Sequence, residues 1–378
     1  MCFGGAVKHE SYEPVKVEPY GDDWIIYPVD GYGQQESVRS ILRTEKPDLL
    51  WFMTDPRFFP WLWEIEDEIR PLVPMVYYHV WDNYPYPNYN KIWYDSCDHV
   101  ACISKVTHDI VKTVAPNTNC SYLPHAVDSE SYRPFKEEEI SKLREQSNID
   151  DNKFIVFWNN RNARRKQSGS LVYWFAKFLD KVGKDKARLI MHTDPGDPNG
   201  PNLVAQINNL GLLNGEIQFS KQKVEASHLA AMYNMADVTV NISDAEGFGL
   251  ATLESLSCGT PIIVNMTGGL QEQVTDGEDW FGVGIEPISK AVIGSQDIPY
   301  IYEDRINEDD FVEALEKLYN MSRKERQEMG NEGRDHVIKN YNFENLQESW
   351  KEMINENINK FGSWETRTGY KSWELIEV

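Results

Sequence analysis

The feature that most constrains the fold is an alternation of short, continuous apolar runs with helix-length amphipathic segments through most of the chain. Such runs are typical of strands buried on both faces, which form parallel sheets covered by their connecting helices. The pattern predicts an α/β protein. In the first half we expect strands at residues 24–28, 49–53, 74–79, 100–103 and 121–123, and helices at 34–44, 60–70 and 105–114.

The alternation breaks once, in SYLPHAVDSESYRPFKEEE, where two prolines and a charged run predict a domain boundary. It restarts with FIVFW. Expected strands lie at 154–158, 187–192, 217–219, 237–242 and 261–265, and helices at 167–181, 203–210, 225–235, 250–257 and beyond 308. A length of 378 residues also suits two domains, at roughly 150 residues per domain.

Composition excludes several classes of function. The formal charge is -22, from 38 basic and 60 acidic residues, which opposes binding to nucleic acids and leaves at most a peripheral contact with membranes. No apolar run approaches the roughly 18 residues of a membrane span, and the first residues lack a signal-peptide pattern. The five cysteines are scattered without metal-ligand spacing, so we expect free thiols and a cytoplasmic protein.

The most informative segment is ISDAEGFGLATLESLSCGTPIIV, residues 242–264. It follows a predicted strand, turns through glycines and enters a helix near Gly249. The first-turn amides of Phe248, Gly249 and Leu250 lack intrahelical acceptors, and with the helix dipole they favour an anion at the strand ends. Gly247 and Gly249 also allow a ligand close to the backbone. The segment therefore predicts a phosphate-binding site.

Two glutamates flank this turn, Glu246 before the predicted helix and Glu254 eight residues later. Either one alone would more often be a solvated residue. Together they suit a ligand rich in hydroxyl groups, because hydroxyls donate hydrogen bonds readily to carboxylates. The pair predicts a sugar-binding function.

The segment EGFGLATLE resembles the Glu-x7-Glu element of the family-4-type retaining glycosyltransferases, which have the GT-B fold. MADVTVNIS, SCGTPIIVNMTGGLQEQVTDG and PHAVDSESYRP also resemble blocks of that family in the same order, and the similarity covers roughly residues 47–286. The resemblance implies two Rossmann-like domains whose parallel sheets face each other across a cleft. We expect domains at 1–133 and 134–342, and a helical segment at 343–378 that packs on the first domain.

The resemblance also assigns donor-site residues. Glu246 matches the glutamate near the transferred sugar, Glu254 the one that binds the ribose, and Gly247, Phe248, Gly249 and Leu250 the turn that approaches sugar and phosphate. In WNNRNARRKQ, Arg161 and Lys166 match the basic pair that neutralises the diphosphate, and Arg164 and Arg165 are alternatives. Gly268, Gly269 and Glu272 resemble a second loop at the donor cleft, although Gly-Gly is also ordinary turn chemistry.

Fewer residues are assigned on the acceptor side. His79 resembles the family's histidine beside the reacting sugar, with Asp82 as a weaker neighbour. Trp81, Tyr84 and Tyr86 are candidates to line that side, although most aromatic residues of this segment should be structural. His192, Thr193 and Asp194 end another predicted strand and are candidates for nucleotide contact, a reading no better than that of an ordinary loop.

The family's first domain normally opens with a strand, a glycine-rich loop and a helix, and the beginning of this sequence lacks that pattern. Either the chain starts late or the unit has been lost. The resemblance implies a hexosyltransferase that uses a nucleotide-diphosphate sugar, a glycan, lipid or small acceptor, and no metal or other cofactor. A non-catalytic nucleotide-sugar-binding subunit and a nucleotide-sugar epimerase remain alternatives, and the oligomeric state is open.

Overall fold

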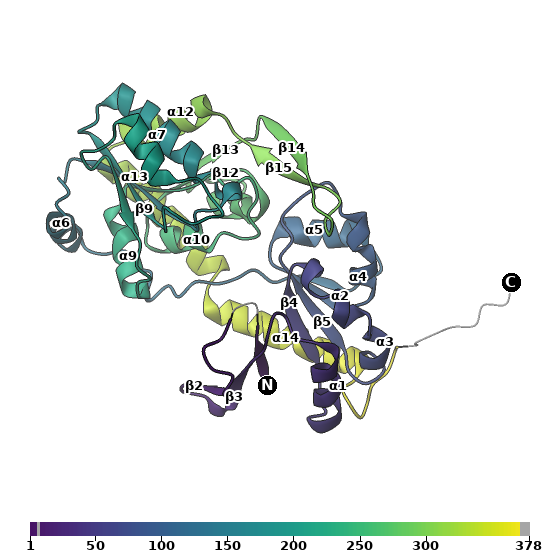
Figure 1. Ribbon diagram of the computed structural model, residues 1–378. Coiled ribbons are helices and arrows are strands. Elements are labelled where there is room, and N and C mark those ends of the chain that lie inside the picture. The colour runs from purple at the N-terminus through teal and green to yellow at the C-terminus, as the bar shows by residue number, and fades with distance from the viewer. Residues whose placement is uncertain (6–7, 371–378) are drawn as a thin grey trace.

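A computed structural model describes residues 1–5 and 8–370. It contains two α/β domains, each built on a parallel sheet (Figure 1). The expected fold class is therefore confirmed. The carboxyl ends of the two sheets face a common cleft, which is lined by residues of both domains.

The N-terminal domain has a four-stranded parallel sheet in the order β4-β5-β6-β7. Its strands are β4 (Leu50–Thr54), β5 (Met75–His79), β6 (His99–Cys102) and β7 (Cys120–Tyr122). The helices are α1 (Gln35–Thr44), α2 (Pro60–Trp63), α3 (Glu66–Ile69), α4 (Lys91–Asp95) and α5 (Lys105–Val114). The helix expected at 60–70 is thus two short helices, because Ile65 leaves the helical conformation.

Three strands near the beginning of the chain form a separate small sheet. Strand β3 (Gly21–Pro28) pairs in parallel with β1 (Cys2–Gly4) and antiparallel with β2 (Val15–Val17). The strand expected at 24–28 therefore exists, but it lies outside the parallel sheet. Among the described residues, no strand, glycine loop and helix precede β4 in that sheet.

The C-terminal domain has a six-stranded parallel sheet in the order β10-β9-β8-β11-β12-β13. The strands are β8 (Phe154–Asn159), β9 (Ala187–His192), β10 (Ile217–Ser220), β11 (Val238–Asn241), β12 (Ile262–Asn265) and β13 (Gly282–Ile285). The helices are α6 (Glu137–Gln146), α7 (Ser168–Val182), α8 (Leu203–Leu210), α9 (Ala226–Met235), α10 (Leu250–Ser257), α11 (Gln271–Val274), α12 (Glu308–Asn320) and α13 (Arg323–Asn340). Buried aliphatic and aromatic side chains fill the space between sheet and helices.

Helix α14 (Phe343–Phe361) leaves the C-terminal domain and runs back along the N-terminal domain (Figure 1). Its Trp350 ring meets the rings of Tyr78 and Trp51 edge-on, with centroids 5.2 and 5.8 Å apart. Residues 371–378 of the expected C-terminal segment lie outside the described residues. None of the described helices is both long and apolar enough to cross a membrane.

Five strands had no counterpart among the expected ones: β1, β2, β13 and the two strands of a hairpin. An antiparallel hairpin, β14 (Ser289–Ile293) and β15 (Ile301–Arg305), is inserted between β13 and α12. It extends from the C-terminal domain toward the N-terminal domain (Figure 1). The tip residue Ile298 is buried in the N-terminal core. The hairpin therefore bridges the two domains.

Candidate active site

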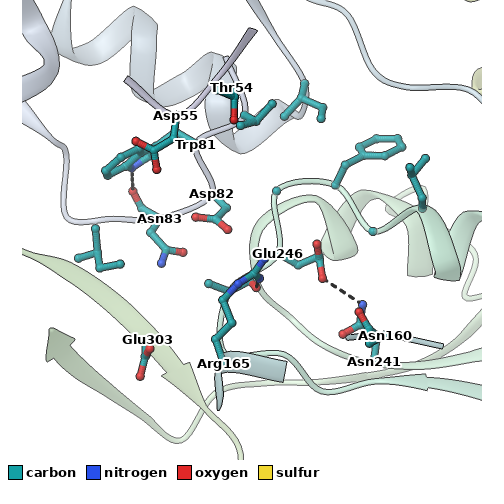
Figure 2. A pocket seen from close by; sticks show the side chains of 18 of the residues that line it. Thr54, Asp55, Trp81, Asp82, Asn83, Asn160, Arg165, Asn241, Glu246 and Glu303 are labelled. Carbon is teal, nitrogen blue, oxygen red and sulfur yellow. Dashed lines mark hydrogen bonds between the residues drawn. The ribbon is translucent and has the colours of Figure 1, made fainter. Parts of the chain in front are cut away.

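The cleft between the domains has a volume of about 720 Å³. This lies in the range of roughly 300–1,000 Å³ that is typical of small-molecule sites. It is lined by the ends of β4 and β5, the segment after β8, the turn between β11 and α10, and the β14–β15 hairpin. Figure 2 shows acidic, basic and amide side chains converging on it from both domains.

The turn that begins α10 presents its backbone to the cleft. Gly249 caps the helix with a φ of 96°, a left-handed conformation that favours glycine. Residues 247–250 all line the cleft, and among the described residues the amides of Gly247, Phe248 and Gly249 donate no hydrogen bond. The expected helix terminus is therefore open to the cleft, and anion binding there stays a prediction.

Glu246, which lines the cleft, forms an ion pair with Lys166, which is absent from the cleft lining and lies behind that carboxylate. Their side chains are only 13% and 10% exposed. Burial disfavours the charge on Glu246, but Lys166 and then Arg165 outweigh it and hold the pKa of the carboxyl below its ordinary value. Burial lowers the pKa of Lys166, and Glu246 opposes this shift. The pair presents an ionised, oriented carboxylate beside the amides of the turn.

Glu254 lies on α10 and lines the same cleft. The hydroxyl of Tyr233 donates to its Oε2 at 2.6 Å. Burial raises the pKa of this carboxyl. The tyrosine thereby orients one carboxylate oxygen. Glu246 and Glu254 both line this cavity, as the sequence predicted.

The basic residues after β8 are distributed differently from the expected pair. Arg161 is exposed, pairs with Asp197 at 2.6 Å and does not line the cleft. Arg164 and Arg165 do line it. Arg165 donates to the carbonyl oxygen of Ala245 at 2.5 Å, and Arg164 pairs with Glu303 of the hairpin. The structure thus brings the alternative, Arg165, to the place expected for Arg161, because the chain turns between the two residues.

His79 does not have the expected acceptor-side position. It is the last residue of β5, is fully buried and is absent from the cleft lining. Its Nδ1 and Nε2 are 2.8 and 2.7 Å from the hydroxyl oxygens of Tyr77 and Tyr94. Burial lowers its pKa to about 3, so it is a neutral core residue. The weaker candidate Asp82 lines the cleft instead, because the chain leaves the sheet after His79.

Gly268 and Gly269 support the donor turn and do not line the cleft. Gly269 donates from its amide to the carbonyl oxygen of Glu246 at 3.0 Å. A Cβ at Gly269 would lie 2.7 Å from the carbonyl oxygen of Gly247. Glu272 is buried against the N-terminal domain. The loop with Gly268, Gly269 and Glu272, which was expected at the cleft, therefore lies behind the turn that carries Glu246 and packs against it.

Of the remaining weaker candidates, only one lines the cleft. Trp81 lines the cleft, whereas the hydroxyls of Tyr84 and Tyr86 donate to Asp109 on α5. His192, Thr193 and Asp194 are absent from the cleft lining.

Sequence reasoning missed Thr54, Asp55 and His125, which line the cleft. Thr54 and Asp55 follow an apolar strand in LWFMTDP, and polar residues at the end of a parallel strand were a usable signal. The hairpin residues carried no such signal. Among the described residues, no three His, Cys, Asp or Glu side chains are grouped so that they could hold a metal ion.

Comparison with known proteins relates this geometry to a family. The model for "Glycosyl transferases group 1" matches residues 139–336. N-acetyl-alpha-D-glucosaminyl L-malate synthase of Bacillus anthracis is 24% identical over 220 residues, which are 58% of this chain and 53% of that protein. Alpha-monoglucosyldiacylglycerol synthase of Streptococcus pneumoniae is 27% identical over 181 residues, 47% of this chain and 40% of that protein. The chain thus spans about half the length of these relatives.

Two solved structures share the fold. Sucrose-phosphate synthase from Thermosynechococcus elongatus superposes with a TM-score of 0.73 at 16% identity, covering 95% of this chain and 88% of that one. HepE from Anabaena, in complex with UDP and glucose, superposes with a TM-score of 0.67 at 15% identity. The match covers 88% of this chain and 86% of that one. Identities this low establish the fold alone. The family model, in contrast, covers more than half of the chain, and the protein belongs to the group 1 glycosyltransferases.

Proposed function

We propose that the protein transfers a hexose from a nucleotide-diphosphate sugar to an acceptor hydroxyl, with retention of the anomeric configuration. The observation that carries this proposal is the Lys166–Glu246 pair, whose carboxylate lines one cavity together with Glu254 and the open amides of Gly247, Phe248 and Gly249. This arrangement suits a ligand with a sugar at one end, a phosphate in the middle and a ribose at the other.

Each group has a part in binding the donor. The helix terminus and Arg165 would hold the diphosphate, since both direct positive potential into the cleft. Arg164, which pairs with Glu303, borders the same space. Glu254 would accept hydrogen bonds from ribose hydroxyls, and Glu246 from hydroxyls of the transferred sugar.

The reaction would break the bond between the anomeric carbon and the diphosphate oxygen and form one to the acceptor oxygen on the same face. The acceptor proton would pass to an oxygen of the departing diphosphate. Arg165 and the helix terminus stabilise the charge that develops on the diphosphate, an effect that typically contributes several kcal/mol per donor group. We propose that these groups suffice without a divalent metal.

Names of relatives indicate the range of acceptors. Two are named as synthases of a malate and a diacylglycerol product, and others as inositol 3-phosphate glycosyltransferases. These names support a hydroxyl of a small molecule or a lipid as the acceptor, and a glycan is a further candidate.

Nucleotide binding tests the donor site first. The melting temperature is measured with UDP, GDP, ADP and CDP, each with and without magnesium. A nucleotide at about 100 times its dissociation constant should add about 2.7 kcal/mol of stability. We expect a shift with one base, independent of magnesium. No shift with any nucleotide would contradict the proposal.

The matching nucleotide sugar then tests the reaction, with the product anomer assigned by NMR. Retention supports the proposal, and inversion refutes the mechanism. Binding without transfer or hydrolysis would indicate a non-catalytic subunit, and conversion of the donor without an acceptor would indicate an epimerase.

A further inference from the structure

In the proposed function the donor occupies the side of the cleft that carries Glu246, Glu254 and Arg165, which leaves the opposite side for the acceptor. We define the acceptor half by six lining residues from the ends of β4 and β5 and from the hairpin: Asp55, Trp81, Asp82, Ile293, Ile298 and Ile301. It lies opposite the turn that carries Glu246 (Figure 2). Its two carboxylates come from the N-terminal domain, and its apolar wall comes from the hairpin. Thr54, Arg57 and Asn83 of the same N-terminal segments also line the cleft.

Asp82 is the free carboxylate of this half. It is half-buried, points into the cleft and, among the described residues, accepts no hydrogen bond and forms no ion pair (Figure 2). Arg165 is the cation that acts on it most strongly, and Glu246, Lys166 and Asp55 also face it. When Arg165 binds a diphosphate, the carboxylate oxygens of Asp82 remain free to accept hydrogen bonds from another ligand.

The remaining charges on this side are already matched. Arg57 lies 3.4 Å from Asp55 and stacks over the ring of Phe58 at 4.9 Å. Arg164 is bound to Glu303. With Arg165 assigned to the diphosphate, the other cations among the described lining residues are Arg57 and Arg164, and each already has a carboxylate partner. A phosphate or carboxylate on the acceptor would have to compete with those partners, and it would also meet Asp82 and Glu246. Placing like charges next to each other is unfavourable, so this half of the cleft disfavours an anionic acceptor.

The hairpin encloses this space from the other side. Asn83 Nδ2 donates to the carbonyl oxygen of Tyr302 at 2.6 Å, and the Tyr89 hydroxyl donates to that of Tyr300 at 2.7 Å. These bonds hold three isoleucines against the cleft, and the hairpin carboxylate that also lines it, Glu303, is paired with Arg164. Sugars present hydroxyls at their edges and C–H groups on their faces. A carboxylate opposite an apolar wall suits such a ligand.

We infer that the acceptor half of the cleft binds an acceptor that presents hydroxyl groups and no anionic group, namely a neutral saccharide or polyol, and that the Asp82 carboxylate accepts a hydrogen bond from one of those hydroxyls. This inference rests on the proposed function and adds the chemical class of its second substrate.

Matched acceptor pairs test the inference. With the donor identified by nucleotide binding, transfer is measured to glucose and glucose 6-phosphate, to myo-inositol and inositol 3-phosphate, and to glycerol and malate. We expect kcat/KM to be about tenfold or more higher for the neutral member of at least one pair. An equal or higher value for every charged member overturns the inference. So does donor hydrolysis without transfer to any neutral compound, a result that leaves the donor site intact. If neither transfer nor hydrolysis occurs, the proposed function fails and this inference fails with it.

A substitution tests the part assigned to Asp82. Asp82→Asn should raise the KM of the neutral acceptor about tenfold or more, since a hydrogen bond to a charged group is lost, and should raise the donor KM much less. Asp67→Asn, at an exposed position on α3, is the matched control and should change neither KM. Equal changes in both KM values, or an unchanged acceptor KM, would overturn the assignment.

Discussion

At the scale of single residues, the Lys166–Glu246 pair affects both donor binding and the free energy of unfolding. Both side chains are nearly withdrawn from solvent. Removing one partner leaves the other charge buried and uncompensated, which typically costs about 3–5 kcal/mol, whereas removing both is much milder. Substitution of one member should therefore have two separate effects: loss of stability from the unpaired buried charge, and loss of the oriented carboxylate that binds the sugar.

We predict that Lys166→Met lowers the free energy of unfolding by about 3 kcal/mol and that adding Glu246→Gln restores most of it. Neither variant should transfer sugar, because the double variant recovers the fold without the oriented carboxylate. Urea unfolding and a transfer assay separate the two effects. Lys324→Met, at a position 83% exposed, is the control and should behave as wild type. A double variant as unstable as the single one would refute the pairing energy.

Asp82 makes stability depend on pH. Burial raises its pKa to about 6, Glu246 and Asp55 add to the shift, and Arg165 and Lys166 oppose it. The ordinary pKa is 3.8, so the unfolded chain releases this proton at lower pH than the folded chain does. The contribution of Asp82 to stability is therefore greatest below about pH 4 and falls as the pH rises to about 6.

We expect Asp82→Asn to raise the free energy of unfolding at pH 7.5 by up to about 2–3 kcal/mol and to change it little near pH 4. Unfolding curves of both proteins at the two pH values check this. The same stability increment at both values would show that the effect does not come from ionisation of Asp82.

At the scale of elements, the hairpin decides how closed the cleft is. Its tip residue Ile298 is 8% exposed and packs in the core of the other domain. The strands themselves carry exposed residues such as Val292, so the tip is the anchor. Weakening the contact between Ile298 and the N-terminal core should let water reach the reacting sugar.

Ile298→Ala should cost about 2–4 kcal/mol and raise the ratio of donor hydrolysis to transfer severalfold. The ratio is measured from free and transferred sugar in one reaction. Ile288→Ala, at a position 61% exposed, provides the matched control. If both variants keep the wild-type ratio, the hairpin does not exclude water.

At the scale of the whole molecule, a carboxylate joins the two domains close to the donor turn. Glu272 on α11 accepts hydrogen bonds from the Lys105 amide and the Tyr122 hydroxyl of the N-terminal domain, both at 2.8 Å. Burial raises the pKa of this carboxyl. Gly269 and Gly268 lie just before it and support the Glu246 turn, so domain orientation and donor-site geometry are coupled.

Glu272→Gln should lower the free energy of unfolding by about 1–3 kcal/mol, because an amide cannot accept both bonds with the strength of a carboxylate. Solution scattering should then show a larger radius of gyration. Glu278→Gln, at an exposed position nearby, should change neither quantity. An unchanged radius would indicate that α14 and the hairpin alone hold the domains together.

Several elements could be predicted from sequence because neighbouring residues determine them. The bounds of α5, α8 and α10 agree with the expected helices, and β8 to β12 of the C-terminal sheet lie within a residue or two of the expected strands, whereas β13 was not expected. Glu246, Glu254 and the turn between them could also be placed, since a strand, a glycine turn and a helix position them locally.

Other assignments failed where side-chain direction depended on distant segments. His79 ends an apolar run that points toward the cleft, yet its ring turns into the core between two tyrosines, one of them fifteen residues away. Arg161 and Arg165 are equally basic in the sequence, and the turn between them decides which one lines the cleft. The hairpin lacked any pattern that identifies its partner surface.

The sequence by itself thus determined the α/β class, the order of the elements and the donor-binding turn, because backbone hydrogen bonding and apolar periodicity are local properties. Only the tertiary structure decided which side chains share the cleft, that Lys166 neutralises Glu246, and that an inserted hairpin closes the acceptor half. Those features depend on contacts between segments more than two hundred residues apart, such as Asn83 with Tyr302, and on the burial that such contacts create. No local pattern encodes them.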